Sequence, residues 1–165
     1  MNRFWRGLAA TVALGIGLLA GSAAFAATVV TVTLWDKGSS TPMGTDMAYM
    51  AGSGMDTSKA TMGVTTAPAT AKTGVVTFQV TNSSKDTIHE MIVMYLADPS
   101  KPLPYISADN RVDEDKAGDK GEVSELNPGA SGTLTVFLKP GKYLLICNVP
   151  GHFEAGMWTE FDVTK

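Results

Sequence analysis

The chain is poor in the residues that most often carry chemistry, since its 165 residues include one cysteine and two histidines. A single cysteine cannot form an internal disulfide, so Cys147 must be buried, bound to a metal or paired with another chain. If His89 and His152 both bind a metal together with Cys147, no histidine is left for a Ser-His-Asp catalytic triad. The chain also has no glycine-rich loop of the phosphate-binding kind. These absences indicate that the protein is not an enzyme.

The first 26 residues have the pattern of a secretory signal peptide. Arg3 and Arg6 form a basic start, residues 8–19 are apolar, and residues 24–26 form a small-x-small cleavage signature. The apolar run is short for a membrane span, although an uncleaved anchor is the alternative. The two arginines are not adjacent, so a twin-arginine signal is not indicated. We expect cleavage after Ala26 and a periplasmic or secreted protein.

The expected mature chain, Ala27 to Lys165, is mildly acidic. Without Arg3 and Arg6 it has 11 basic and 16 acidic residues, a net charge of −5 at neutral pH. This balance argues against nucleic acid as a partner. We expect a monomer with a division at about residue 60: a first strand and a flexible segment in residues 27–60, and the main domain in residues 61–165.

Alternation of apolar and polar residues predicts an all-β protein. The clearest segments are Thr28–Trp35, Val75–Thr81, Thr133–Leu138, Tyr143–Cys147 and Trp158–Val163. Thr87–Leu96 is apolar almost throughout, which is typical of a strand that is covered on both faces. Turn-forming residues separate these segments, and no stretch has a convincing helical pattern. Many short strands with regular turn signals indicate a β-sandwich or barrel.

Two stretches differ from ordinary core sequence. Gly38–Met62 holds Met43, Met47, Met50, Met55 and Met62 among glycine, serine, threonine and aspartate, and is too polar to pack a core. Since thioethers favour Cu(I), this segment is either a tolerated flexible insertion or a weak Cu(I) site. Asp98–Glu125 is rich in proline, glycine and charge. We interpret it as a solvated connection, with a docking surface as the alternative.

The last nineteen residues place Cys147, His152 and Met157 at five-residue intervals. A proline–glycine pair between the first two forces a tight turn, and a glycine before the methionine allows a second reversal. Taken singly, each residue has an ordinary structural explanation, such as core packing. Together with His89, which lies near the start of a predicted strand, they are the donors that a trigonal copper site with a weak axial ligand requires.

These residues resemble those of the cupredoxins, the family of small blue-copper proteins. The Cys-x4-His spacing is similar to azurin-like members, the His-x4-Met spacing is similar to rusticyanin-like members, and the strand pattern fits from about Thr61 to Lys165. The resemblance implies a Greek-key β-sandwich with one type 1 copper, in which His89, Cys147 and His152 are equatorial ligands and Met157 is axial. Glu90 stands where azurin-like members often have an asparagine that ties the ligand loops together.

The resemblance further implies one-electron transfer, because four protein ligands leave no open position for a substrate. The expected partner is a c-type cytochrome or a copper oxidase or reductase that docks near His152, on an apolar patch of Phe153, Ala155 and Trp158. Copper buffering, delivery or resistance is the competing hypothesis, and the methionine-rich segment supports it. A zinc site fits less well, because a thioether is a poor ligand for zinc.

Overall fold

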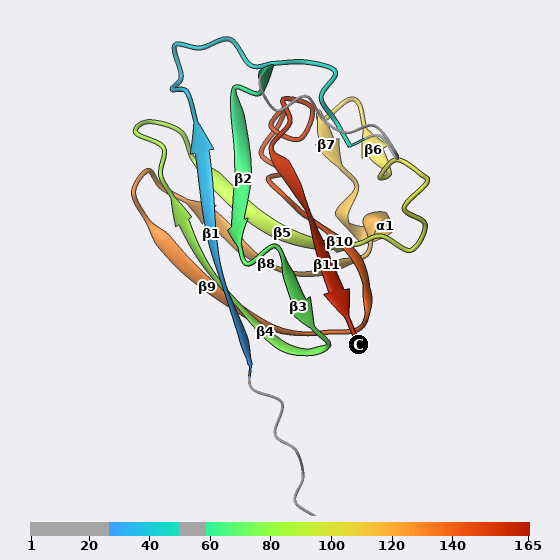
Figure 1. Ribbon diagram of the computed structural model, residues 1–165. Coiled ribbons are helices and arrows are strands. Elements are labelled where there is room, and N and C mark those ends of the chain that lie inside the picture. Colours follow the sequence, from blue (N-terminus) through green and yellow to red (C-terminus); the bar gives the residue numbers. More distant parts are fainter. Residues whose placement is uncertain (1–26, 50–58) are drawn as a thin grey trace, which may run out of the picture.

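The computed structural model describes residues 27–49 and 59–165, which form a two-layer β-sandwich (Figure 1). In this part of the chain one sheet has the order β2 (Met62–Ala67), β1 (Thr28–Asp36), β4 (Gly74–Asn82) and β9 (Ser131–Leu138). The other has the order β3 (Thr70–Lys72), β11 (Trp158–Thr164), β10 (Gly141–Ile146), β5 (His89–Tyr95) and β8 (Asp119–Leu126). The expected signal peptide, Met50 and Met55 lie outside the described residues.

The main core lies between the two sheets and follows the period-two alternation of the sequence. Val30, Val32 and Leu34 of β1 face inward, and so do Val76 and Phe78 of the neighbouring β4. Successive side chains of a strand point to opposite faces, so these residues form one apolar layer while the threonines between them face solvent. The all-β prediction is confirmed, and β1 lies inside its sheet between β2 and β4.

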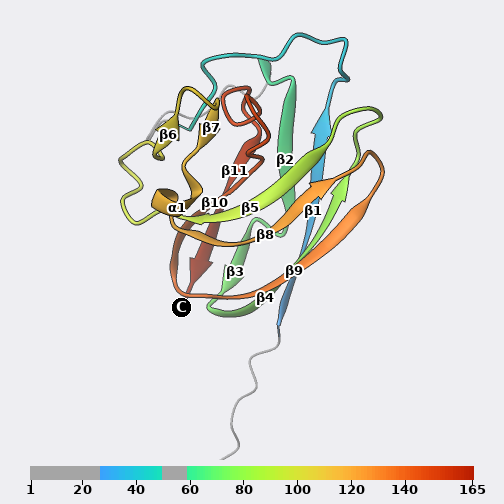
Figure 2. The same cartoon turned by 180° about the vertical axis from the view of Figure 1, so that it is seen from behind.

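Strand β5 is buried on both faces, as its continuous apolar sequence predicts. Met91 and Val93 enter the main core, whereas Ile92 and Met94 enter a second cluster on the outer face of the same sheet. Residues 98–118 and Tyr49 cover that outer face. They include the small sheet of β6 (Tyr105–Ile106) and β7 (Arg111–Val112), and the short helix α1 (Glu114–Ala117), which lie together at one side of the molecule (Figure 2).

The interpretation of Asp98–Glu125 as a solvated connection is wrong. The segment contains β6, β7, α1 and all but the last residue of the edge strand β8, and buries Val112 and Ala117. Because β8 is an edge strand with most of its side chains exposed, its sequence carries charge and lacks a strong apolar alternation. The sequence also gave no sign of α1, which begins after the N-cap Asp113 and ends at Gly118 in a left-handed conformation.

The loops at one end of the sandwich bring distant parts of the chain together. The segment after β1, residues 37–49, crosses the top of the molecule above the loop between β10 and β11 (Figure 1). The backbone N–H of Met47 donates to the carbonyl of Glu154 at 2.9 Å, which joins the two segments directly. Across the described ranges, no helix has the length and apolar character needed to traverse a membrane.

Candidate metal centre

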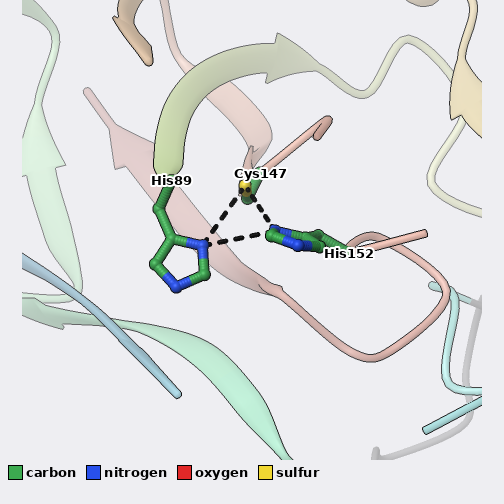
Figure 3. A group of neighbouring side chains, drawn as sticks. All are labelled: His89, Cys147 and His152. Atoms are coloured by element: carbon green, nitrogen blue, oxygen red, sulfur yellow. Dashed lines mark hydrogen bonds between the residues drawn. The ribbon is translucent and has the colours of Figure 1, made fainter. Parts of the chain in front are cut away.

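Three side chains from two segments that are far apart in the sequence converge at this end of the sandwich (Figure 3). His89 is the first residue of β5, Cys147 directly follows β10, and His152 lies in the loop before β11. The Nδ1 atoms of the two histidines are 3.2 Å apart, and Cys147 Sγ lies 3.3 Å from His152 Nδ1 and 3.9 Å from His89 Nδ1. Strands β5 and β10 are antiparallel neighbours, with Ile92 opposite Ile146, which brings His89 and Cys147 to the same end of the sheet.

The spacing of these donors fits one metal ion. The point equidistant from the three atoms lies about 2.0 Å from each, close to the roughly 2.0–2.3 Å of metal–nitrogen and metal–thiolate bonds. Both histidines and the cysteine are buried. Two imidazoles and one thiolate in a trigonal arrangement are the equatorial donors of a blue-copper site.

The loop from Cys147 to Met157 is folded by its own backbone hydrogen bonds. The N–H of His152 donates to the carbonyl of Val149 at 2.9 Å, and a φ of +83° at Gly151 allows the tight turn between them. Met157 is fully buried; its N–H donates to the carbonyl of His152 and its carbonyl accepts from the N–H of Cys147, both at 2.9 Å. The backbone of Met157 is therefore hydrogen-bonded to Cys147 and to His152, the two loop residues whose side chains reach the centre.

Glu90 joins the two ligand segments. Its backbone N–H donates to Cys147 Sγ at 3.5 Å, and its Oε1 atom accepts from the backbone N–H of Asn148 at 3.0 Å. The tie that azurin-like proteins often build with an asparagine is thus built here with a carboxyl group. Burial, with added repulsion from Glu114, raises the pKa of Glu90 to about 7.

Asn148 connects the centre to the segment that covers the outer sheet face. Its Oδ1 accepts from the N–H of Val112 at 2.7 Å. Its Nδ2 donates to the Val112 carbonyl at 3.0 Å and to Glu114 Oε1 at 2.7 Å. This buried side chain therefore fixes β7 and the start of α1 against the ligand loop. No local sequence pattern indicates this role, because the partners are more than thirty residues away.

Burial also sets the protonation states of the donors. It raises the pKa of the Cys147 thiol to about 12, although N–H groups of Glu90 and Val149 favour the thiolate. Burial, together with the nearby His89, lowers the pKa of His152 to about 4, and burial lowers that of His89 as well. At neutral pH the imidazoles are therefore neutral and ready to bind a metal, whereas the thiol must release a proton when it does so.

Asp36, the last residue of β1, is a site residue that the sequence did not reveal. Its Oδ2 atom lies 2.6 Å from His89 Nε2. The other nitrogen of the same ring, Nδ1, is the one that faces Cys147 and His152. Burial alone would raise the pKa of Asp36, but hydrogen bonds from Ser84, His89 and Gly38 outweigh it and hold this pKa below its usual value. Fifty-three residues separate Asp36 from His89, so no local pattern could link them.

The predicted apolar docking patch of Phe153, Ala155 and Trp158 is wrong, because all three residues are buried. The ring of Tyr49 meets that of Trp158 edge-on at 5.2 Å, and Trp158 Nε1 donates to the Met47 carbonyl at 2.8 Å. The surface near His152 is instead a pocket of about 220 Å³. Its walls include Asp36, Ser39, Thr41, Met43, Met62, Thr87 and His152.

Comparisons with known proteins give a family and a similar fold. The profile of the family described as the sulfocyanin (SoxE) domain matches residues 55–165, well over half of the chain. No curated protein matches the sequence. A reduced rusticyanin structure is similar with a TM-score of 0.50 and 16% identity, over 85% of this chain and 82% of that one.

Two auracyanin structures also match this chain. Reduced auracyanin from the photosynthetic bacterium Roseiflexus castenholzii has a TM-score of 0.48 and 19% identity, over 85% of this chain and 98% of that one. Auracyanin A, a "blue" copper protein from Chloroflexus aurantiacus, has a TM-score of 0.44 and 25% identity, over 58% of this chain and 83% of that one.

The family match and the three converging donors lead to the same assignment. Cupredoxins bind one type 1 copper ion, and two imidazoles and a buried thiol within 3.9 Å of one another suit that ion. The resemblance drawn from the sequence is confirmed. The chain belongs to the sulfocyanin (SoxE) family and is a blue-copper protein of the cupredoxin type.

Proposed function

We propose that this protein carries single electrons between redox partners in the periplasm or outside the cell. In this proposal His89, Cys147 and His152 would hold the copper ion, and Met157 would be a fourth, weaker ligand. The convergence of the three buried donor atoms carries the proposal. The signal-peptide pattern of residues 1–26 supports the location, and the family of blue-copper proteins supports the activity.

Copper bound by these residues supplies one-electron chemistry between Cu(I) and Cu(II). The chain contributes a rigid and water-poor surrounding. Cys147 and Met157 share a backbone hydrogen bond, and Glu90 ties the cysteine to the strand of His89. Donors that are held in place need little movement when the charge of the site changes, which favours fast electron exchange.

The edge of His152 is the proposed point of electron passage. His152 lines the pocket at the surface, whereas His89 is enclosed and uses its outer nitrogen to contact Asp36. The partner proposed is a c-type cytochrome or a copper oxidase or reductase. It would contact the mouth of this pocket, where residues 37–43 contribute small polar side chains and the exposed thioether of Met43.

The direct test is optical and kinetic. Copper-loaded, oxidised protein is expected to hold one copper per chain and to show an intense visible absorption band. Mixing with a reduced c-type cytochrome should bleach this band with one-electron stoichiometry, and reoxidation should restore it. Zinc-loaded protein is the control and should leave the cytochrome reduced. A Cu(II) protein without an intense visible band would contradict the proposal.

Replacement of Met157 by leucine tests the axial position. The variant should still bind copper through its other three ligands, because leucine has a similar volume but no donor atom. Loss of a weak donor to Cu(II) should raise the reduction potential by about 60 mV, a tenfold change in the ratio of Cu(II) to Cu(I) affinity. Met94→Leu, in the second apolar cluster, is the matched control. An unchanged potential, or loss of copper, would argue against axial ligation by Met157.

Copper handling is the second candidate function, and one feature of the pocket favours it. Met43 and Met62 line the same pocket as His152, and Met43 is 51% exposed although it is apolar. The prediction that Gly38–Met62 is a flexible segment is wrong for Met62, which begins β2 and is buried in the main core. A soft thioether at the mouth of a copper site, such as that of Met43, suits the transient capture of Cu(I).

A Cu(I) competition titration separates the two functions. Wild type is expected to bind a second, weaker equivalent of Cu(I) that a variant with Met43, Met47, Met50 and Met55 changed to leucine does not bind. Cu(II) should show no such difference, since thioethers are poor ligands for that ion. Met94→Leu again serves as the control for loss of a methionine. One equivalent of Cu(I) in all three proteins would retire the handling function.

A further inference from the structure

The carboxylate of Asp36 stands directly behind one of the proposed copper ligands. Its Oδ2 atom lies 2.6 Å from His89 Nε2, and both side chains are almost wholly enclosed, with exposures of 5% and 0%. The other ring nitrogen, Nδ1, faces Cys147 and His152. We propose that Asp36 is a positioning residue of the metal centre, which fixes the tautomer and orientation of His89 and lowers the reduction potential of the copper. This inference rests on the proposed function.

Asp36 is held so that it cannot turn away from the imidazole. The backbone N–H of Gly38 donates to its Oδ1 at 2.6 Å, and Ser84 contributes a further hydrogen bond. The residue ends β1 and lies opposite Met62 of β2, so its backbone is fixed by pairing with that neighbouring strand. Oδ1 therefore accepts from the Gly38 N–H, while Oδ2 contacts His89.

The tautomer follows from this contact. An ionised carboxylate only accepts hydrogen bonds, so the 2.6 Å contact requires the proton of a neutral His89 to be on Nε2. The lone pair is then on Nδ1, the atom that lies 3.2 Å from His152 Nδ1 and 3.9 Å from Cys147 Sγ. A carboxylate behind a ligand histidine in this way selects the metal-binding tautomer and makes the imidazole a stronger donor.

The charge of Asp36 also affects the two oxidation states unequally. A fixed negative charge beside an enclosed ligand stabilises the more positive, oxidised site more than the reduced one. The stronger imidazole donor acts in the same direction. Both effects favour Cu(II), so Asp36 lowers the potential.

The experiment compares Asp36→Asn, Asp36→Leu and the matched control Asp86→Asn. Asparagine keeps the shape of Asp36 without its charge, whereas leucine removes the acceptor. Asp86 is an exposed carboxylate at the same end of the molecule, close enough to Asp36 for the two charges to repel, and it bonds to Ser39 rather than to His89. Loss of Asp86 therefore removes one negative charge and leaves the contact with the ligand intact.

Asp36→Asn is expected to retain copper and to raise the ratio of Cu(I) to Cu(II) affinity at least tenfold, which is about 59 mV for a one-electron couple. Asp36→Leu should weaken Cu(II) binding by roughly 10- to 100-fold. Asp86→Asn should change the affinity ratio by less than twofold. Equal potentials in Asp36→Asn and Asp86→Asn would overturn the effect on potential.

A second readout needs no copper. Nitrogen-15 NMR of the copper-free protein should show His89 of wild type protonated at Nε2 alone, and a mixture of tautomers in Asp36→Leu. A wild-type His89 protonated at Nδ1, or the same single tautomer in Asp36→Leu, would overturn the positioning role. If wild type gave no one-electron copper couple, the proposed function would fail, whereas the tautomer measurement would still decide whether Asp36 orients His89.

Discussion

Replacement of Cys147 by serine is expected to abolish the intense visible absorption of the oxidised copper protein. The absorption requires a thiolate bound to copper, and Cys147 is the chain's only cysteine. Its Sγ atom lies within 3.9 Å of both histidine Nδ1 atoms. No other residue of the chain can supply a thiol in its place. The Cu(II) that the two histidines retain should absorb only weakly.

The fold should survive this substitution. Serine is slightly smaller than cysteine, and its hydroxyl can accept the hydrogen bond that Glu90 donates to the sulfur. The free energy of unfolding of the copper-free protein should therefore fall by no more than about 2 kcal/mol. Absorption and circular dichroism of the same sample check both statements, with Met91→Leu as a buried sulfur control. A full visible band in Cys147→Ser would refute the assignment of the site.

Replacement of Asn148 by alanine is expected to cause a large loss of stability. The substitution leaves the N–H and carbonyl of Val112 and the carboxylate of Glu114 without the amide that now contacts them. Because Val112 and Asn148 are buried, water cannot simply take the place of the lost side chain. We expect the free energy of unfolding of the copper-free protein to fall by about 2–4 kcal/mol.

Urea denaturation of the copper-free protein measures this effect. Asn127→Ala, at an exposed turn, is the matched control and should change the free energy of unfolding by about 0.5 kcal/mol or less. Asn148→Ala should also increase amide hydrogen exchange in β7 and α1, since the side chain fixes these elements to the ligand loop. Stability equal to that of Asn127→Ala would show that the covering segment is held by its apolar contacts alone.

The sequence by itself determined the all-β class, the principal strands and the three side chains that converge at the candidate metal centre. Alternation along strands such as β1 and β4 is a local signal, because each side chain's face depends on its immediate neighbours. The small number of cysteine and histidine residues also restricted the choice of metal ligands, since a chain with one cysteine and two histidines has few ways to build a soft-metal site. The turns of the ligand loop could also be predicted from the sequence, and Gly151 and Gly156 have the positive φ that such turns require.

Only the tertiary structure decided what surrounds the donors. The contact of Asp36 with His89 spans 53 residues, and that of Asn148 with Val112 spans 36. Such contacts depend on which strands become neighbours, and polar residues at strand ends carry no periodic signal. The same holds for Trp158, whose sequence suggested an exposed patch but which residues 37–49 cover. Local alternation fixes which face of a strand is apolar, whereas packing between distant segments decides which residues brace the metal centre.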